Sequence, residues 1–177
     1  QAWAGWYFSP QVKWGSFAAR PKEHEATPNY YGYGLGVSCG YSVSQFLDLG
    51  VAASYLPGNR EDAKIGSPHA ELSLYGGELA FRFAQAVYLG VRGGVTQYNM
   101  ATARKVRAEE LTGIWDGKAI VFALGGIAPL DRENYLQTTI ELWHTTMSNR
   151  RDDAAGQRKL DAFAVTFGYS SSRVWSR

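Results

Sequence analysis

Three side chains in the last third of the chain are of the types that carry out hydrolysis. His144 and Thr146 occupy alternate positions of one run, and Asp161 stands in the next run. A hydroxyl becomes a nucleophile when an imidazole takes its proton and a carboxylate orients that imidazole. Residues two apart in a strand point to the same face, so His144 and Thr146 would share a face, with Asp161 on the matching face of the next strand. This set defines the enzymatic alternative for the chain.

The other histidines do not indicate a metal site. His24 and His69 lie in different polar segments, and nothing at metal-ligand spacing accompanies them. The single cysteine, Cys39, cannot form an internal disulfide and is expected to be a small hydrophobic residue of an apolar face. We therefore expect no metal and no other cofactor.

Six charged residues interrupt the polar faces of otherwise apolar runs. Three are basic and three are acidic, so each charge has an available partner of opposite sign: Lys13, Asp48, Glu78, Arg82, Arg92 and Glu141. Buried charges are tolerated when they are paired and hydrogen-bonded. We predict an interior charge network that fills the space between the strands. The alternatives are a polar path for a solute and a gate whose ion pairs exchange.

Alternation of large and small residues indicates which elements position these groups. Apolar residues, most of them large, occupy the odd positions from Tyr31 to Tyr41, and glycine or serine occupies the even positions between them. Strand side chains point alternately to opposite faces, so this run predicts a strand with one apolar face and one nearly bare face. A face of glycine and serine indicates an interior with little room.

Similar runs predict about eight strands. Their ranges are roughly residues 6–18, 30–41, 46–56, 70–83, 87–98, 118–127, 134–147 and 160–170. A change of phase near Gly76 and Gly77 predicts a β-bulge in the fourth run. The sixth run is apolar on both faces and gives no clear phase. Short turns and long charged segments alternate between the runs.

Short turns at one end and long segments at the other, around an even number of strands, are typical of an outer-membrane barrel. A sheet that spans lipid has to close, because lipid cannot hydrogen-bond an open edge. The 177 residues, 45% of them hydrophobic, then form a single domain, 1–177. Its fold class is all-β, an antiparallel up-and-down transmembrane barrel with both termini periplasmic. Aromatic residues near the run ends are candidates for interfacial girdles: Trp6, Tyr31, Tyr55 and Trp143.

A soluble barrel of lipocalin or streptavidin type is the alternative architecture. There the apolar face lines the cavity, so the glycines would face water and weaken the strands without any gain. Inside a narrow barrel the same glycines leave room for other side chains. A net charge of +2 with scattered basic residues gives no case for nucleic-acid binding. The pattern favours the membrane barrel.

In strand number and alternation the whole chain resembles the small eight-stranded outer-membrane barrels, which include the OmpA-type transmembrane domain and its OmpX- and OmpW-like relatives. The resemblance implies a protein of a Gram-negative outer membrane that serves as an anchor, an adhesin, a surface contact or a narrow, porin-like channel. Such barrels end on an aromatic residue, whereas this chain continues from Tyr169 to Arg177. Either Tyr169 or Trp175 then has that role, or a further segment follows the strand.

The set of His144, Thr146 and Asp161 is weakly similar to the outward-facing His-Ser-Glu site of the PagL lipid A deacylases. Threonine stands where that family has serine, and residues 144–149 lack its His-x-Ser-Asn order. A lone histidine at the membrane interface is more often part of an interfacial girdle than of a catalytic site. We therefore expect a protein that is not an enzyme, with a lipid A hydrolase as the alternative.

Function is expected to reside in the long outer segments, as a membrane anchor or a surface contact. The expected partners are outer-membrane lipid and lipopolysaccharide, and other surface or envelope proteins. Basic residues of these segments can pair with lipopolysaccharide phosphates, or else remain ordinary solvated charges. They are Arg20, Lys22, Arg60, Lys64, Arg104, Lys105, Arg107, Arg150, Arg151 and Arg158.

Overall fold

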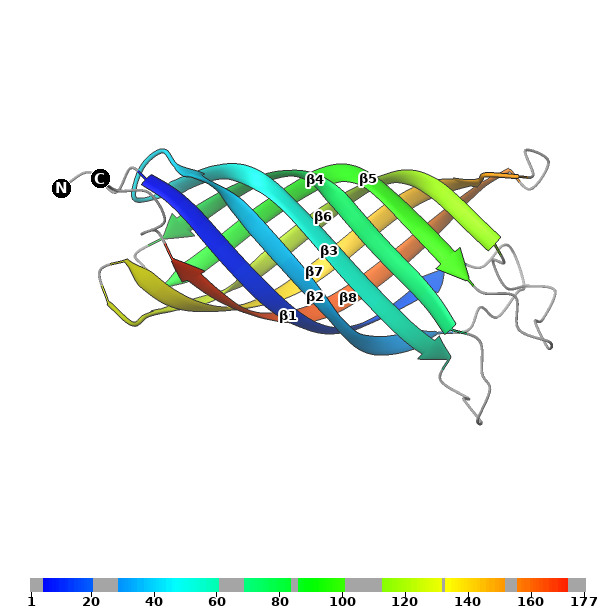
Figure 1. The fold of residues 1–177 in the computed structure, drawn as a ribbon, viewed down its shortest axis with the longest axis horizontal. Coiled ribbons are helices and arrows are strands. Elements are labelled where there is room, and N and C mark those ends of the chain that lie inside the picture. Colours follow the sequence, from blue (N-terminus) through cyan, green and yellow to red (C-terminus); the bar gives the residue numbers. More distant parts are fainter. Residues whose placement is uncertain are drawn as a thin grey trace.

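Eight antiparallel strands form one closed barrel in the computed structural model of the chain (Figure 1). The structure describes residues 5–20, 29–60, 69–83, 86–100, 113–131, 133–151 and 156–171. Each strand pairs with its neighbours along the chain, and β8 pairs with β1 to close the sheet. The predicted all-β fold class, an antiparallel up-and-down barrel, is confirmed.

The strands extend further than the sequence predicts, mainly at one end of the barrel. Their bounds are β1 (Gly5–Ala19), β2 (Tyr30–Ser42), β3 (Leu47–Arg60), β4 (His69–Phe83), β5 (Val87–Met100), β6 (Gly113–Pro129), β7 (Asn134–Asn149) and β8 (Gln157–Ser171). A strand crosses a bilayer with about 9–11 residues. The strands here have 13 to 17 residues, so each is long enough to project beyond the apolar layer.

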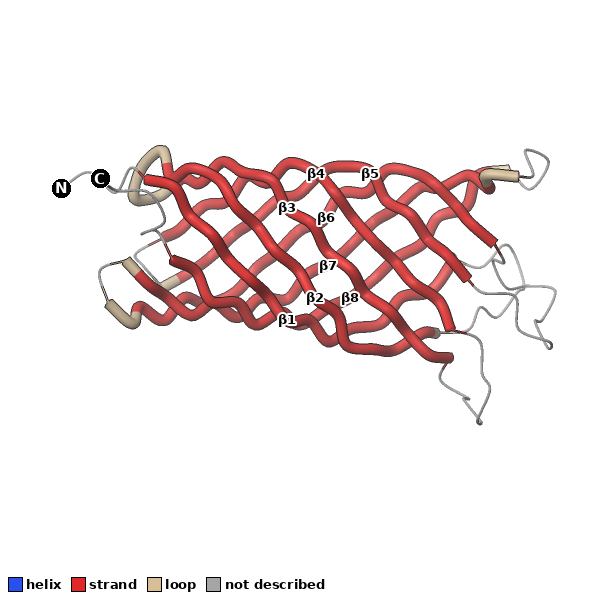
Figure 2. Tube along the Cα trace, viewed as in Figure 1, coloured by secondary structure: helices blue, strands red, loops and turns tan. Residues whose placement is uncertain are grey.

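The two ends of the barrel differ. The start of β1, the end of β8 and the turn at residues 43–46 lie together at one end, which we call the turn end (Figures 1 and 2). The starts of β2, β4, β6 and β8 lie at the other, which we call the opposite end. All the strands cross the barrel obliquely, as a closed sheet requires. The described residues include no helix with the length and apolar character needed to cross a membrane.

The two faces of the sheet match the predicted alternation. Large apolar side chains point outward around the barrel, with Tyr33 79% and Leu35 63% exposed, while Gly34 between them is buried. The outside of the barrel is therefore apolar. A soluble barrel would show the reverse arrangement, with its apolar side chains inside.

The interior is layered, and this corrects two predictions. Its half nearer the opposite end is an apolar cluster that includes Phe17, Leu72, Leu74 and Trp143. Register is continuous through Gly76 and Gly77 on both sides of β4, so the predicted bulge is wrong. The phase change arises because the leucines point inward to this cluster. Trp143 is likewise fully buried and is not a girdle residue.

Glycines on the inner face leave space for long side chains from other strands. A Cβ added at Gly36 of β2 would lie 2.6 Å from Cε of Lys13, and one added at Gly50 of β3 would collide with the Tyr7 hydroxyl. The glycine-rich face predicted from the sequence therefore packs against side chains that fill the lumen.

Candidate functional site

Four charged side chains from four strands form one network across the lumen. Lys13 of β1 donates from Nζ to Glu141 Oε1 of β7 at 2.7 Å. Arg92 of β5 donates from Nη1 to the same oxygen at 2.7 Å and from Nε to Glu78 Oε2 of β4 at 2.5 Å. These side chains are 0–3% exposed. The register places Glu78 directly opposite Arg92.

Polar neighbours add further hydrogen bonds to the network. Trp143 Nε1 donates to the second oxygen of Glu141 at 3.0 Å. Lys13 also donates to Thr166 Oγ1 at 3.2 Å, and the Tyr88 hydroxyl donates to Glu78 Oε1 at 3.2 Å. Charges removed from water at this depth need such partners to be tolerated.

Arg82 and Asp48 form a separate pair nearer the turn end. Arg82 Nη2 donates to Asp48 Oδ1 at 2.6 Å and to Ser42 Oγ at 3.1 Å. Its guanidinium lies 5.6 Å from the ring centroid of Tyr135. Six inward charges thus divide into a four-residue network and one pair, each without net charge.

Two of the basic residues expected to contact phosphate are already paired with carboxylates. Arg20 forms two hydrogen bonds with Asp161, and Arg150 forms two with Asp116. The pKa of Arg150, which follows β7, is raised above its usual value, mainly by its hydrogen bond to Asp116.

The remaining basic candidates divide by position. Arg60 is partly exposed at the end of β3, Arg158 is partly exposed at the start of β8, and Arg151 is exposed just beyond β7. Five others lie outside the described residues: Lys22, Lys64, Arg104, Lys105 and Arg107.

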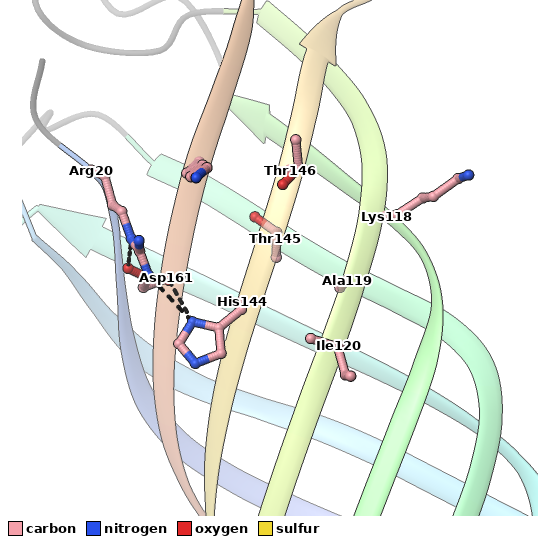
Figure 3. Close-up of a pocket in the computed structure, with 9 residues that line it drawn as sticks. Arg20, Lys118, Ala119, Ile120, His144, Thr145, Thr146 and Asp161 are labelled. Atoms are coloured by element: carbon pink, nitrogen blue, oxygen red, sulfur yellow. Dashed lines mark hydrogen bonds and ion pairs between the residues drawn. The ribbon is translucent and has the colours of Figure 1, made fainter.

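His144, Thr146 and Asp161 all project from the outer face, but only two of them touch. His144 Nδ1 lies 2.8 Å from Asp161 Oδ1, and Nη2 of Arg20 lies 3.0 Å from the same oxygen and 3.5 Å from His144 Nδ1. The imidazole points toward Asp161 and Arg20, whereas Thr146 lies further along β7 (Figure 3). Asp161 therefore orients the imidazole of His144, but the Thr146 hydroxyl is not hydrogen-bonded to that imidazole. Within the described part of the chain, no group of three His, Cys, Asp or Glu residues is arranged to hold a metal ion.

A shallow hollow of about 490 Å³ surrounds these groups on the outer face of β6, β7 and β8. Two of its lining residues, Lys118 and Lys159, were absent from the sequence-based candidates. Lys118 lies in the run that gave no phase, so its outward direction could not be read from the sequence.

Comparison with solved structures identifies the architecture. The Neisserial surface protein A superposes with a TM-score of 0.64 at 11% identity, covering 96% of this chain and 98% of that one. Ail, the attachment invasion locus protein of Yersinia pestis, gives 0.52 at 12% identity, covering 94% and 98%. The chain has the fold of the small eight-stranded outer-membrane barrels.

The outer-membrane protein AlkL, solved in lipid bilayers, shares this barrel fold with a TM-score of 0.50 at 14% identity, covering 98% of this chain and 92% of that one. Near-complete coverage of both chains means that the eight-stranded barrel is common to all of them. No protein-family model and no curated protein matches the sequence.

Proposed function

We propose that this protein is a non-enzymatic barrel of the bacterial outer membrane that anchors its outer segments at the cell surface and has a closed lumen. The observation that carries the proposal is the ion-pair network of Lys13, Glu141, Arg92 and Glu78. It joins four of the eight strands across the interior with side chains 0–3% exposed.

A second layer supports closure. The apolar cluster toward the opposite end includes Leu56, Leu72 and Leu74, each fully buried. A hydrated ion moving along the axis would have to displace both the apolar side chains and the paired charges. The interior of an eight-stranded barrel is narrow enough for its own side chains to fill. The two layers can therefore close the lumen without any other part of the chain.

The outward apolar surface supports membrane insertion, and the topology supports an orientation. We propose that the turn end faces the periplasm and the opposite end faces outward, as in barrels with short periplasmic turns. The longer segments at residues 21–28, 61–68 and 101–112 would then be the outer ones, available to other surface or envelope proteins. Exposed basic residues such as Arg151 would add a weak, general attraction to lipopolysaccharide phosphates there.

Membrane placement is tested with single spin labels in a Cys39→Ser background. Val95 is 60% exposed on the outer face, and Thr96 is 3% exposed on the inner face. We expect a lipid-phase quencher to reach a label at Val95→Cys and not one at Thr96→Cys. The reverse result would mean that the apolar face is shielded from lipid.

Closure is tested by recording from the purified barrel in planar bilayers. We expect no steady conductance from the wild-type protein. A large steady conductance would contradict the closed lumen and favour the channel alternative.

A further inference from the structure

An outward row of residues crosses three neighbouring strands near the opposite end. Lys118 of β6 is the register partner of Thr146 of β7, and Thr146 is the partner of Lys159 of β8. All three side chains are exposed on the outer face. Adjacent strands lie about 4.8 Å apart, so the two lysines start about 10 Å apart with the threonine hydroxyl between them. Figure 3 shows Lys118 and Thr146 projecting from β6 and β7.

This row lies at a boundary between polar and apolar surface. On its polar side the next outward row is Asp116, Ser148 and Gln157. On its other side, past the row of His144 and Asp161, come Phe122, Leu142 and Phe163, which are 45%, 47% and 37% exposed. In a membrane barrel, such a boundary falls where lipid headgroups meet acyl chains.

The charge of the hollow is unbalanced. Arg20 is neutralised by Asp161, with which it forms two hydrogen bonds. Neither Lys118 nor Lys159 has an ion pair with any residue that the structure describes. Two exposed ammonium groups therefore face outward on either side of a hydroxyl, and no carboxylate of the described residues forms an ion pair with them.

We propose that Lys118, Thr146 and Lys159 bind the phosphate group of an outer-leaflet glycolipid of the lipid A type. The two ammonium groups would donate to phosphate oxygens from either side, and the Thr146 hydroxyl would donate between them. The acyl chains would run along Phe122 and Leu142. This site depends on the proposed membrane placement but not on the closed lumen.

The site differs from general attraction by basic segments, because its geometry is fixed by strand register. A fixed pair of lysines should discriminate between phosphorylated and dephosphorylated lipid. Scattered charges on the outer segments should respond only to their total number.

The test is native mass spectrometry of the folded barrel in detergent, titrated with bis-phosphorylated lipid A. The site variant is Lys118→Gln/Lys159→Gln, and the charge-retaining variant is Lys118→Arg/Lys159→Arg. Arg151→Gln/Arg158→Gln removes the same total charge nearby and is the matched control. Loss of two charge-assisted hydrogen bonds should weaken binding of the site variant at least about 10-fold. The charge-retaining variant and the control should change less than about 3-fold.

The site would be overturned by an unchanged affinity of the site variant, by an equal loss in the control, or by equal binding of fully dephosphorylated lipid A by the wild type. Full competition by inorganic phosphate at the lipid concentration would also overturn it, since the site would then recognise free phosphate. Each variant is first checked for the heat-dependent gel mobility of a folded barrel. A wild-type chain that stays soluble and folded without detergent would instead contradict the proposed function.

Discussion

Glu141 is the central residue of the lumen network, because one of its oxygens accepts from both Lys13 and Arg92. Arg92 also bonds to the carboxylate of Glu78, so it keeps a partner when Glu141 is removed. Lys13 forms its ion pair with Glu141. Removing one partner of a buried pair costs about 3–5 kcal/mol, because the remaining charge is uncompensated. The consequence of losing Glu141 should therefore fall mainly on Lys13.

We predict that Glu141→Gln destabilises the barrel more than the double variant Lys13→Met/Glu141→Gln does. The double variant removes one charge of each sign and keeps the Arg92–Glu78 pair intact. Urea unfolding in lipid vesicles, followed by tryptophan fluorescence, measures both free energies of unfolding. A double variant that is no more stable than Glu141→Gln would mean that removing Lys13 does not relieve the loss of Glu141.

His144 gives the second residue-scale prediction. Its imidazole is held toward Asp161, and Asp161 is also bound by Arg20, so Thr146 is not activated in this arrangement. We predict that cells expressing the protein keep all acyl chains on lipid A, as measured by mass spectrometry. Loss of a chain that is restored by His144→Ala would establish hydrolysis and replace the non-enzymatic proposal.

Among the elements, β2 depends on glycine where Lys13 crosses the lumen. A Cβ at Gly36 would lie 2.6 Å from Lys13 Cε, whereas one at outward-facing Gly93 of β5 would meet nothing within 4 Å. We predict that Gly36→Ala destabilises the barrel by about 1–3 kcal/mol, as overpacking usually does. Gly93→Ala is the control and should be neutral or slightly stabilising, since it limits only the unfolded chain. Equal effects in urea unfolding would mean that Lys13 moves aside without cost.

Alternation predicts most of the strands because apolar exterior and polar interior have a period of two. It does not predict the apolar half of the lumen. Leu72, Leu74 and Trp143 point inward, whereas a pattern of apolar exterior and polar interior would place such large apolar residues on the outside. Their direction is set by contacts among strands distant in sequence, which local periodicity does not contain. The row of Lys118, Thr146 and Lys159 could not be predicted for a similar reason. Both faces of β6 are apolar, so the sequence does not show which of its residues point outward or how β6 aligns with β7.

The whole barrel has two barriers in series along its axis, and they differ in chemistry. The ionic layer joins β1, β4, β5 and β7 through paired charges. The apolar layer beyond it contains fully buried side chains such as Leu72, Leu74 and Trp143. A hydrated ion cannot enter an apolar layer without losing its water, so the second barrier should hold by itself.

We therefore predict that replacing Lys13, Glu78, Arg92 and Glu141 together with neutral residues leaves the barrel non-conducting in planar bilayers. Adding Leu72→Ala, Leu74→Ala and Trp143→Ala should then open it, because both layers are thinned. Each variant is recorded only if its gel mobility shifts on heating as the wild type's does. Steady conductance from the charge-neutral variant alone would show that the ion pairs are the sole seal. If the combined variant does not conduct, the remaining interior side chains must collapse into the space left by those removed.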